Sequence, residues 1–513
     1  MTVRQLSLRQ LSLRQLSLLQ LSWLQLPRLE RLPGQRRAFR GLLLAIGILA
    51  LCACGGGGGA GSLASAPGGI DRSGQSVGTV GQFGSVFVCG VEYRTTGATI
   101  IVDGQAGQEA DLRVGQVVTV FGTRDASGLT GTATRIVYDD NVEGPISVLD
   151  PTNGRLVVLG QTVLVDASTV FDDGNAPRDL TGLALGDVVE VSGFVDAAGN
   201  VRASRIERKA AGGELEVRGT VSAVDTGARQ FTINGLRVDY ATATLADFDG
   251  ANPANGQLVE VKGTTFGTGG VLVATRVERE TASLIGTDGR PSELEGYITR
   301  FASAQDFDVS GVRVTTSAST TFAEGSAADL AVGVKVEVDG TVSGTSLAAT
   351  AVRVERDSSR RVAGRVQAVD AAAGRLTVLG VVVSVDINTQ FEDNTNQRLR
   401  PFNLGRINVD DFVEVRGAAG TGAVDIVASR VERDELEAES EVRGMVETFL
   451  DPTIVIGGVT VTVGDGTDFK DRDGNEVSRA AFFTALRTGD RLKASGQATG
   501  PSAIAGLEVE YED

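Results

Sequence analysis

The sequence contains no histidine, and this absence removes most familiar catalytic designs. Without an imidazole the chain can form no Ser-His-Asp or Cys-His nucleophile, no histidine-ligated zinc site and no imidazole switch near neutral pH. Lysine is scarce too, because only five of the 48 basic residues are lysines. We therefore expect a protein that is not an enzyme and needs no cofactor.

Aromatic residues are also few, at 5% of the chain, and the single tryptophan, Trp23, lies near the N-terminus. Little aromatic surface is therefore present for stacking against bases or sugars. Glycine is abundant instead: 67 of the 513 residues are glycine, roughly twice the usual share. This excess predicts many turns and a flexible segment.

Only one long apolar run occurs, at residues 41–51, and three arginines at 36, 37 and 40 precede it. A basic segment followed by about 11 apolar residues is typical of a secretory signal, and it is too short to span a bilayer. We interpret residues 1–53 as a low-complexity N-terminus followed by a lipoprotein signal peptide.

The residues Leu51-Cys-Ala-Cys54 resemble the lipobox of bacterial lipoproteins. The resemblance makes Cys54 the lipidated residue after cleavage, with an uncleaved anchor or ordinary secretion as alternatives. Residues 54–76 are rich in glycine and predict a flexible tether. By resemblance to Gram-negative lipoproteins, glycine rather than aspartate after Cys54 implies sorting to the outer membrane, with the membrane as a partner through the lipid anchor.

Processing makes the chain more acidic. The first 53 residues carry eight arginines and Glu30, so their removal changes the formal net charge from −17 to −24. Such a body repels phosphate backbones, and we expect no nucleic-acid partner. Cys89 is then the only cysteine beyond the signal region, which excludes an intramolecular disulfide. We expect Cys89 to be a small buried strand residue.

The remaining chain is repetitive, and this is its strongest signal. One phrase, exemplified by Ala428-Ser-Arg-Val-Glu-Arg433, closes nearly every unit, with its first arginine at positions 135, 205, 276, 353 and 430. A second phrase, exemplified by Gly186-Asp-Val-Val-Glu-Val-Ser-Gly193, precedes it. Six units follow from this spacing. They occupy residues 77–140, 141–210, 214–280, 292–357, 360–434 and 440–513.

Within a unit the apolar residues alternate, which predicts about five valine-rich strands and no long helix. Five strands in about 70 residues suit a small OB-like barrel, where closure removes exposed sheet edges. The sequence thus predicts an all-β tandem array of six such barrels. A continuous β-sandwich shared between neighbours is the alternative. The gaps after the third strands, for example 171–185 and 391–408, predict a short helix or loop.

These phrases resemble those of a bacterial family of secreted lipoproteins known as domain-of-unknown-function family 5666. The resemblance rests on the glycine-rich lipoprotein start, the Gly-x-Val opener and the two repeated phrases, and it covers roughly residues 77–511. It implies tandem structural repeats and carries no activity with it.

Three motifs could indicate chemistry, and each has a simpler interpretation. Gly74-Gln-Ser-Val-Gly78 matches a nucleophile elbow but lacks a histidine base. Asp225-Thr-Gly227 resembles one half of an aspartic-protease pair, yet no second copy exists, so we expect a hairpin turn. The closing arginines alternate with glutamates, as in Arg276-Val-Glu278. They predict cross-strand ion pairs on an exposed face, with a phosphate or sugar-acid site as the alternative.

One acidic loop is a candidate metal site. Asp471, Asp473 and Asn475 start like a calcium-binding loop, because carboxylate and amide oxygens are suitable calcium ligands. The loop lacks the sixth-position glycine and the twelfth-position glutamate, so a polar turn is the competing interpretation.

Two functions remain open. The first is a lipid-anchored envelope protein whose barrels bind a glycan or protein partner, since OB-like barrels often bind oligosaccharides. The second is a purely structural spacer or envelope scaffold.

Overall fold

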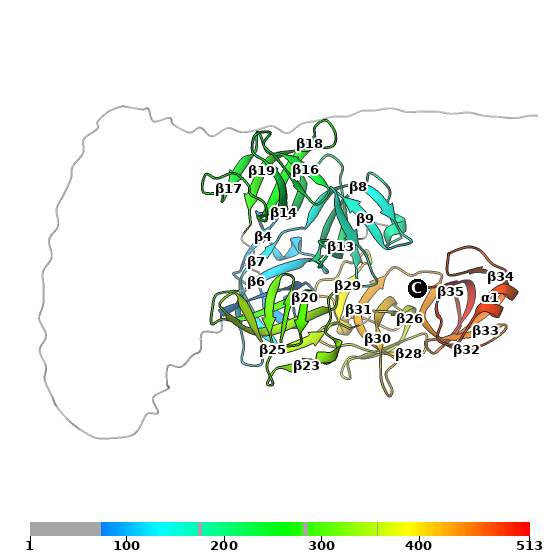
Figure 1. Ribbon diagram of the computed structural model, residues 1–513. Helices are drawn as coiled ribbons and strands as arrows, with labels where there is room; N and C mark the ends of the chain where they lie inside the picture. Colours follow the sequence, from blue (N-terminus) through cyan, green and yellow to red (C-terminus); the bar gives the residue numbers. More distant parts are fainter. Residues whose placement is uncertain (1–72, 173–176, 281–285, 357, 513) are drawn as a thin grey trace, which may run out of the picture. The chain divides into compact units, whose positions relative to one another are not determined.

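The computed structural model describes residues 73–172, 177–280, 286–356 and 358–512, which form β-strands joined by short turns (Figure 1). In these ranges no helix is long and apolar enough to cross a membrane. The predicted lipidation residue Cys54 lies outside the described residues.

The first three repeats contain nineteen strands and two 3₁₀ turns among their described residues. Repeat 1 comprises β1 (Ser73–Thr79), β2 (Val86–Val88), β3 (Val91–Arg94), β4 (Thr99–Val102), β5 (Gln105–Gly107), η1 (Glu109–Asp111), β6 (Val117–Arg124) and β7 (Thr130–Tyr138). Repeat 2 comprises β8 (Val142–Asp150), β9 (Arg155–Val158), β10 (Gln161–Leu164), β11 (Val170–Phe171), η2 (Leu180–Gly182), β12 (Val188–Val195) and β13 (Val201–Lys209). Repeat 3 comprises β14 (Leu215–Asp225), β15 (Gln230–Ile233), β16 (Leu236–Asp239), β17 (Thr244–Ala246), β18 (Leu258–Phe266) and β19 (Leu272–Arg279).

Repeats 4 and 5 follow the same order of elements as repeat 2, whereas repeat 6 has a helix in place of the short strand and the 3₁₀ turn. Repeat 4 comprises β20 (Pro291–Ser303), β21 (Asp306–Val309), β22 (Val312–Thr315), β23 (Thr321–Ala323), η3 (Ala327–Asp329), β24 (Lys335–Ser343) and β25 (Ser346–Val354). Repeat 5 comprises β26 (Arg360–Asp370), β27 (Arg375–Val378), β28 (Val381–Ser384), β29 (Gln390–Asp393), η4 (Leu404–Arg406), β30 (Phe412–Ala419) and β31 (Ile426–Asp434). Repeat 6 comprises β32 (Ser440–Leu450), β33 (Thr453–Ile456), β34 (Val459–Lys470), α1 (Arg479–Ala485), β35 (Arg491–Gly500) and β36 (Ala503–Tyr511).

Each repeat closes five main strands into a small barrel, although in repeat 1 the first two strands meet only at an isolated bridge between Val80 and Val88. In repeat 2, β8 pairs with both β9 and β12, β9 pairs with β10, β10 runs parallel to β13, and β13 returns to β12. The parallel pairing of the third and fifth main strands recurs in all six repeats. The predicted array of OB-like barrels is therefore confirmed.

The barrels nevertheless join through their first strands. β8 pairs with β14, and β26 pairs with β32, in both cases antiparallel. β1 instead pairs in parallel with β20, so repeat 1 is joined to repeat 4. The described strands thus form sheets of 13, 12 and 11 strands, each spanning two barrels. The repeated sequence phrases did not predict these partners.

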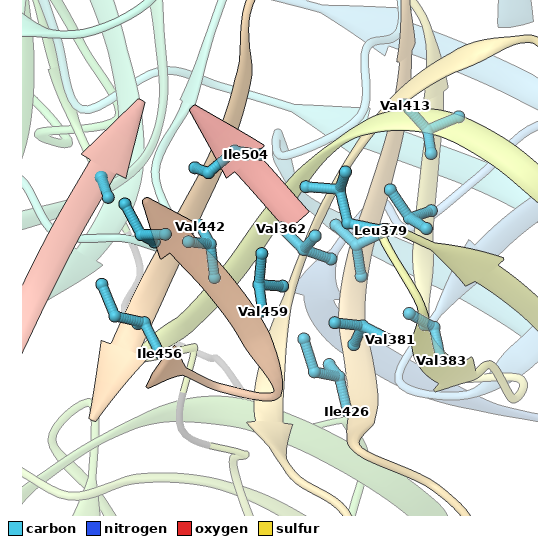
Figure 2. Close-up of a cluster of buried hydrophobic side chains, with 14 of the residues drawn as sticks. Val362, Leu379, Val381, Val383, Val413, Ile426, Val442, Ile456, Val459 and Ile504 are labelled. Carbon is cyan, nitrogen blue, oxygen red and sulfur yellow. The ribbon is translucent and has the colours of Figure 1, made fainter. Parts of the chain in front are cut away.

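Joining the first strands also merges the cores of repeats 2 and 3 and those of repeats 5 and 6. Val362 of β26 and Val442 of β32 are directly opposite each other and fully or almost fully buried. One apolar cluster runs through both repeats 5 and 6 at this point (Figure 2). Valine suits these positions because its branched side chain packs well on a pleated surface.

The last glycine of the second phrase has a steric role. In all six repeats the pairing of the fourth and fifth strands shifts register at this glycine. A Cβ atom built on Gly263 would lie 2.6 Å from the carbonyl oxygen of Val273, and one on Gly340 would lie 2.5 Å from that of Ala348. Only glycine permits so close an approach of two backbones at a bulge.

The gap between the third and fourth main strands holds short elements, as expected. Five of the six repeats add a separate short strand beside the fifth strand, and four of those five have a 3₁₀ turn. Repeat 6 has the helix α1 instead, which buries Phe482 in the core. At the other end of the array, β1 begins at Ser73, within the segment predicted as tether.

Candidate functional site

The predicted calcium loop is a tight polar turn after β34. Asp471 Oδ1 accepts hydrogen bonds from the backbone N–H groups of Asp473 at 3.0 Å and Asn475 at 2.9 Å. The structure therefore brings the three predicted residues together, but it uses one Asp471 oxygen to hold the turn. This is the arrangement of an Asx turn, which needs no metal.

A second acidic loop, after β29, is closed by an arginine. Arg433 Nη2 lies 2.7 Å from Asp393 Oδ2 and its Nε lies 3.0 Å from Oδ1, which is a bidentate pair. Burial alone would raise the pKa of Asp393, but hydrogen bonds from Arg433 and from the Leu399 N–H hold that pKa below its usual value. This loop is therefore a structural ion pair.

The closing arginines were predicted to lie on one exposed face, but the structure buries some of them. Arg276 is 43% exposed, as expected, but it pairs at 2.6 Å with Glu278 of its own strand rather than across strands. Arg205 and Arg430 are buried instead, each with about 4% of its surface exposed. They donate to main-chain carbonyls of other repeats, Arg205 to Val114 at 3.1 Å and Arg430 to Thr169 at 3.3 Å.

The two motifs that resemble catalytic signatures have structural roles. Asp225 Oδ1 accepts from the N–H groups of Gly227 and Ala228, both at 2.9 Å, so this motif is the expected hairpin turn. Ser76 lies within β1 rather than at a strand-to-helix turn, and it donates to Glu293 at 2.8 Å across the junction of repeats 1 and 4.

Cys89 differs from its prediction as a strand residue. It is buried, but it lies in the turn between β2 and β3 with φ of 51°, followed by Gly90 with φ of 70°. Two consecutive left-handed residues form the turn that best matches the twist of a hairpin. Burial, together with nearby glutamates, raises the pKa of the Cys89 thiol well above its ordinary value, which makes it a poor nucleophile.

Sequence reasoning missed a cationic groove that the tertiary structure assembles. The groove has a volume of about 530 Å³ and draws on repeats 2, 4 and 6. We define the cationic groove by its five basic residues: Arg202, Lys335, Arg356, Arg443 and Arg491. No single phrase of the sequence contains them, so only their positions in the closed barrels could have indicated the site.

The charges of the cationic groove are partly compensated. Lys335 lies 2.8 Å from Glu295 and 2.9 Å from Glu355, and these carboxylates hold its pKa well above the usual value against the effect of burial. Arg491 differs, because it donates to the Ser359 carbonyl at 3.2 Å and has no carboxylate partner in the part of the chain that the structure describes. An anionic group could therefore be bound here.

Comparison with known proteins identifies one family. The model of the family described as "Domain of unknown function (DUF5666)" matches six segments: 75–137, 143–207, 218–278, 295–353, 363–432 and 443–510. No curated protein matches. Among solved structures, the Drosophila chain titled "drosophila Unr CSD456" is 17% identical, with 42% of this chain and 98% of that chain covered. With a TM-score of 0.12, this similarity establishes nothing about the present chain.

Proposed function

This chain belongs to the DUF5666 family, and from that premise we propose that it is a non-enzymatic, lipid-anchored protein of the bacterial outer membrane whose repeats bind an anionic glycan. Its anchor would be Cys54, at the end of the signal-like segment. The barrels would then be held at the envelope by the glycine-rich tether. A glycan with carboxylate groups is the ligand that the site chemistry favours.

The cationic groove is the observation that carries this proposal. It gathers five basic side chains against three acidic ones, Asp166, Glu355 and Glu512, in a chain whose formal net charge is −17. Arg491 has a guanidinium group with no acidic partner among the described residues, and a guanidinium matches the geometry of a carboxylate. Tyr297 also lines the groove, but this residue is only 7% exposed and its ring lies 4.9 Å from the Arg202 guanidinium, so it positions Arg202 rather than offering a face to a sugar.

The purely structural spacer remains the competing function. In a linear repeat array each repeat contacts only its neighbours along the chain. Here repeat 1 pairs with repeat 4 through β1 and β20, and Arg430 of repeat 5 donates to repeat 2. A simple spacer does not require contacts between distant repeats, so their presence favours a binding assembly.

Binding can be tested with the full chain purified in detergent. We expect oligogalacturonate, a carboxylate-bearing glycan, to bind while neutral dextran does not. The Arg491→Gln variant should bind about tenfold more weakly, because it loses one charge-assisted hydrogen bond. Arg94→Gln is the matched control, since the Arg94 side chain is 62% exposed and lies outside the groove. Equal binding by both variants, or none by the wild type at millimolar glycan, would contradict the glycan proposal.

Anchoring is tested separately by labelling cells with radioactive palmitate. We expect the wild type and Cys52→Ala to be labelled and Cys54→Ala to lose the label, because only Cys54 follows a small residue in the lipobox-like segment. Equal labelling of the two variants would refute the assignment of Cys54.

A further inference from the structure

A buried cluster of carboxylates lies where repeats 2 and 3 join. Asp140 precedes β8, Glu143 lies in β8 and Glu190 lies in β12. One carboxylate oxygen from each residue lies within 4.8 Å of the other two. Asp140 is 2% exposed and Glu190 is 4% exposed, so water cannot freely solvate these charges.

The strand register adds a fourth carboxylate to the cluster. β8 is flanked by β12 and β14, and Glu143 is directly opposite Glu190 on one side and Glu216 on the other. Like charges directly opposite in a sheet repel each other. The repeated Val-Glu-Val phrase supplies Glu190, and the pairing of the first strands then brings in glutamates from repeat 3.

Two lysines compensate part of this charge. Lys209 lies 2.5 Å from Glu190, and Lys262 lies 2.5 Å from Glu216. Asp140 Oδ1 is buried and has no hydrogen-bond partner among the described residues, although its carboxylate faces the cluster. A buried, unpartnered carboxylate oxygen is costly, and it points to a missing cation.

At the equivalent junction of repeats 5 and 6, arginine side chains neutralise the buried carboxylate. Val362 and Val142 are equivalent, since each pairs with a valine of the fourth strand and a valine of the next barrel. By this register, Glu190 corresponds to Glu414. Glu414 lies 2.5 Å from both Arg361 and Arg416, and these arginines hold its pKa well below the usual value despite burial.

Repeat 2 has neither of these arginines. The same register places Asn141 where repeat 5 has Arg361, and Ser192 where it has Arg416. Asp140 replaces a third arginine, Arg360. The junction of repeats 2 and 3 thus keeps the glutamate, gains an aspartate and lacks the guanidinium groups that would balance them.

We propose that Asp140, Glu143 and Glu190 bind a calcium ion that takes the place of these arginines. Calcium prefers oxygen ligands at about 2.3–2.6 Å, so oxygens sharing one ion lie no more than about 5 Å apart. The three carboxylate oxygens meet this limit. The site is separate from the turn at Asp471 and independent of the glycan proposal.

The test uses the full chain in detergent, stripped with EDTA and then given calcium or magnesium. We expect about one bound calcium per chain by elemental analysis, and a melting temperature several degrees higher in 1 mM calcium than in EDTA. Asp140→Asn should bind calcium at least tenfold more weakly. In EDTA this variant should melt at or above the wild-type temperature, because a buried repulsive charge has been removed.

Asp471→Asn combined with Asp473→Asn is the control, and it should bind calcium as the wild type does. No bound calcium in the wild type, or undiminished binding by Asp140→Asn, would overturn the proposal. Loss of calcium in the Asp471 control would also overturn it and assign the ion to the exposed turn. An equal stabilisation by magnesium would overturn the choice of calcium.

Discussion

Replacing Arg430 by methionine is expected to destabilise repeat 5 by about 3–5 kcal/mol, because it leaves a buried carboxylate without its partner. Arg430 Nη2 lies 2.5 Å from Glu432, and the two side chains are only 4% and 6% exposed. The variant also loses the hydrogen bond to the Thr169 carbonyl of repeat 2. The local opening free energy of β31, measured by hydrogen exchange, reports this loss.

Arg276→Met is the matched control, since Arg276 occupies the same place in the closing phrase of repeat 3. Its side chain is 43% exposed, so its pair with Glu278 contributes about 0.5 kcal/mol. Arg430→Met combined with Glu432→Met should recover part of the lost stability, because the buried carboxylate at position 432 is removed with its partner. Glu392, which also lies 3.4 Å from Arg430, keeps Arg205 at 3.6 Å. If Arg430→Met and Arg276→Met lost the same amount of stability, the burial of Arg430 would not be the cause of the loss.

Replacing Gly496 by alanine is expected to cost about 2–3 kcal/mol in the last barrel. A Cβ atom at this position would collide with the carbonyl oxygen of Ala505 on the adjacent strand. Backbone atoms cannot rotate away as a side chain can, so β35 and β36 would have to separate. Hydrogen exchange of the amides in these two strands should accelerate by about 30-fold or more.

The control for this change is Gly444→Ala in the same repeat. A Cβ atom on Gly444 would meet nothing closer than 3.7 Å, so this variant should change stability by less than about 1 kcal/mol. If both variants behaved alike, loss of glycine flexibility rather than the close backbone approach would explain the repeated phrase.

The sequence predicted the strands and the barrels well because both depend on local patterns. Alternating valines identify strands, and positions such as Gly193 and Gly160 mark bulges and hairpins whatever the neighbouring repeat is. It failed for Cys89, which was expected in a strand. A cysteine at φ of 51° is uncommon, and the turn is indicated only by the glycine that follows it.

The candidate sites were much less predictable. The turn at Asp471 was visible in the sequence because its residues are close together in the chain. The cationic groove combines Arg202 and Arg491, which are far apart in sequence, and the carboxylate cluster combines Asp140 with Glu190. Their charges come together only through strand register and the pairing of barrels.

With no histidine and only five lysines, the positive charge of this protein lies almost wholly on arginine. By itself the sequence determined six glycine-marked β units, because alternation and turn chemistry act over a few residues. Only the tertiary structure decided that repeat 1 joins repeat 4, and that Arg430 is buried while Arg276 is exposed. The physical reason is that burial depends on which barrel edge packs against which, and identical phrases carry no information about that choice.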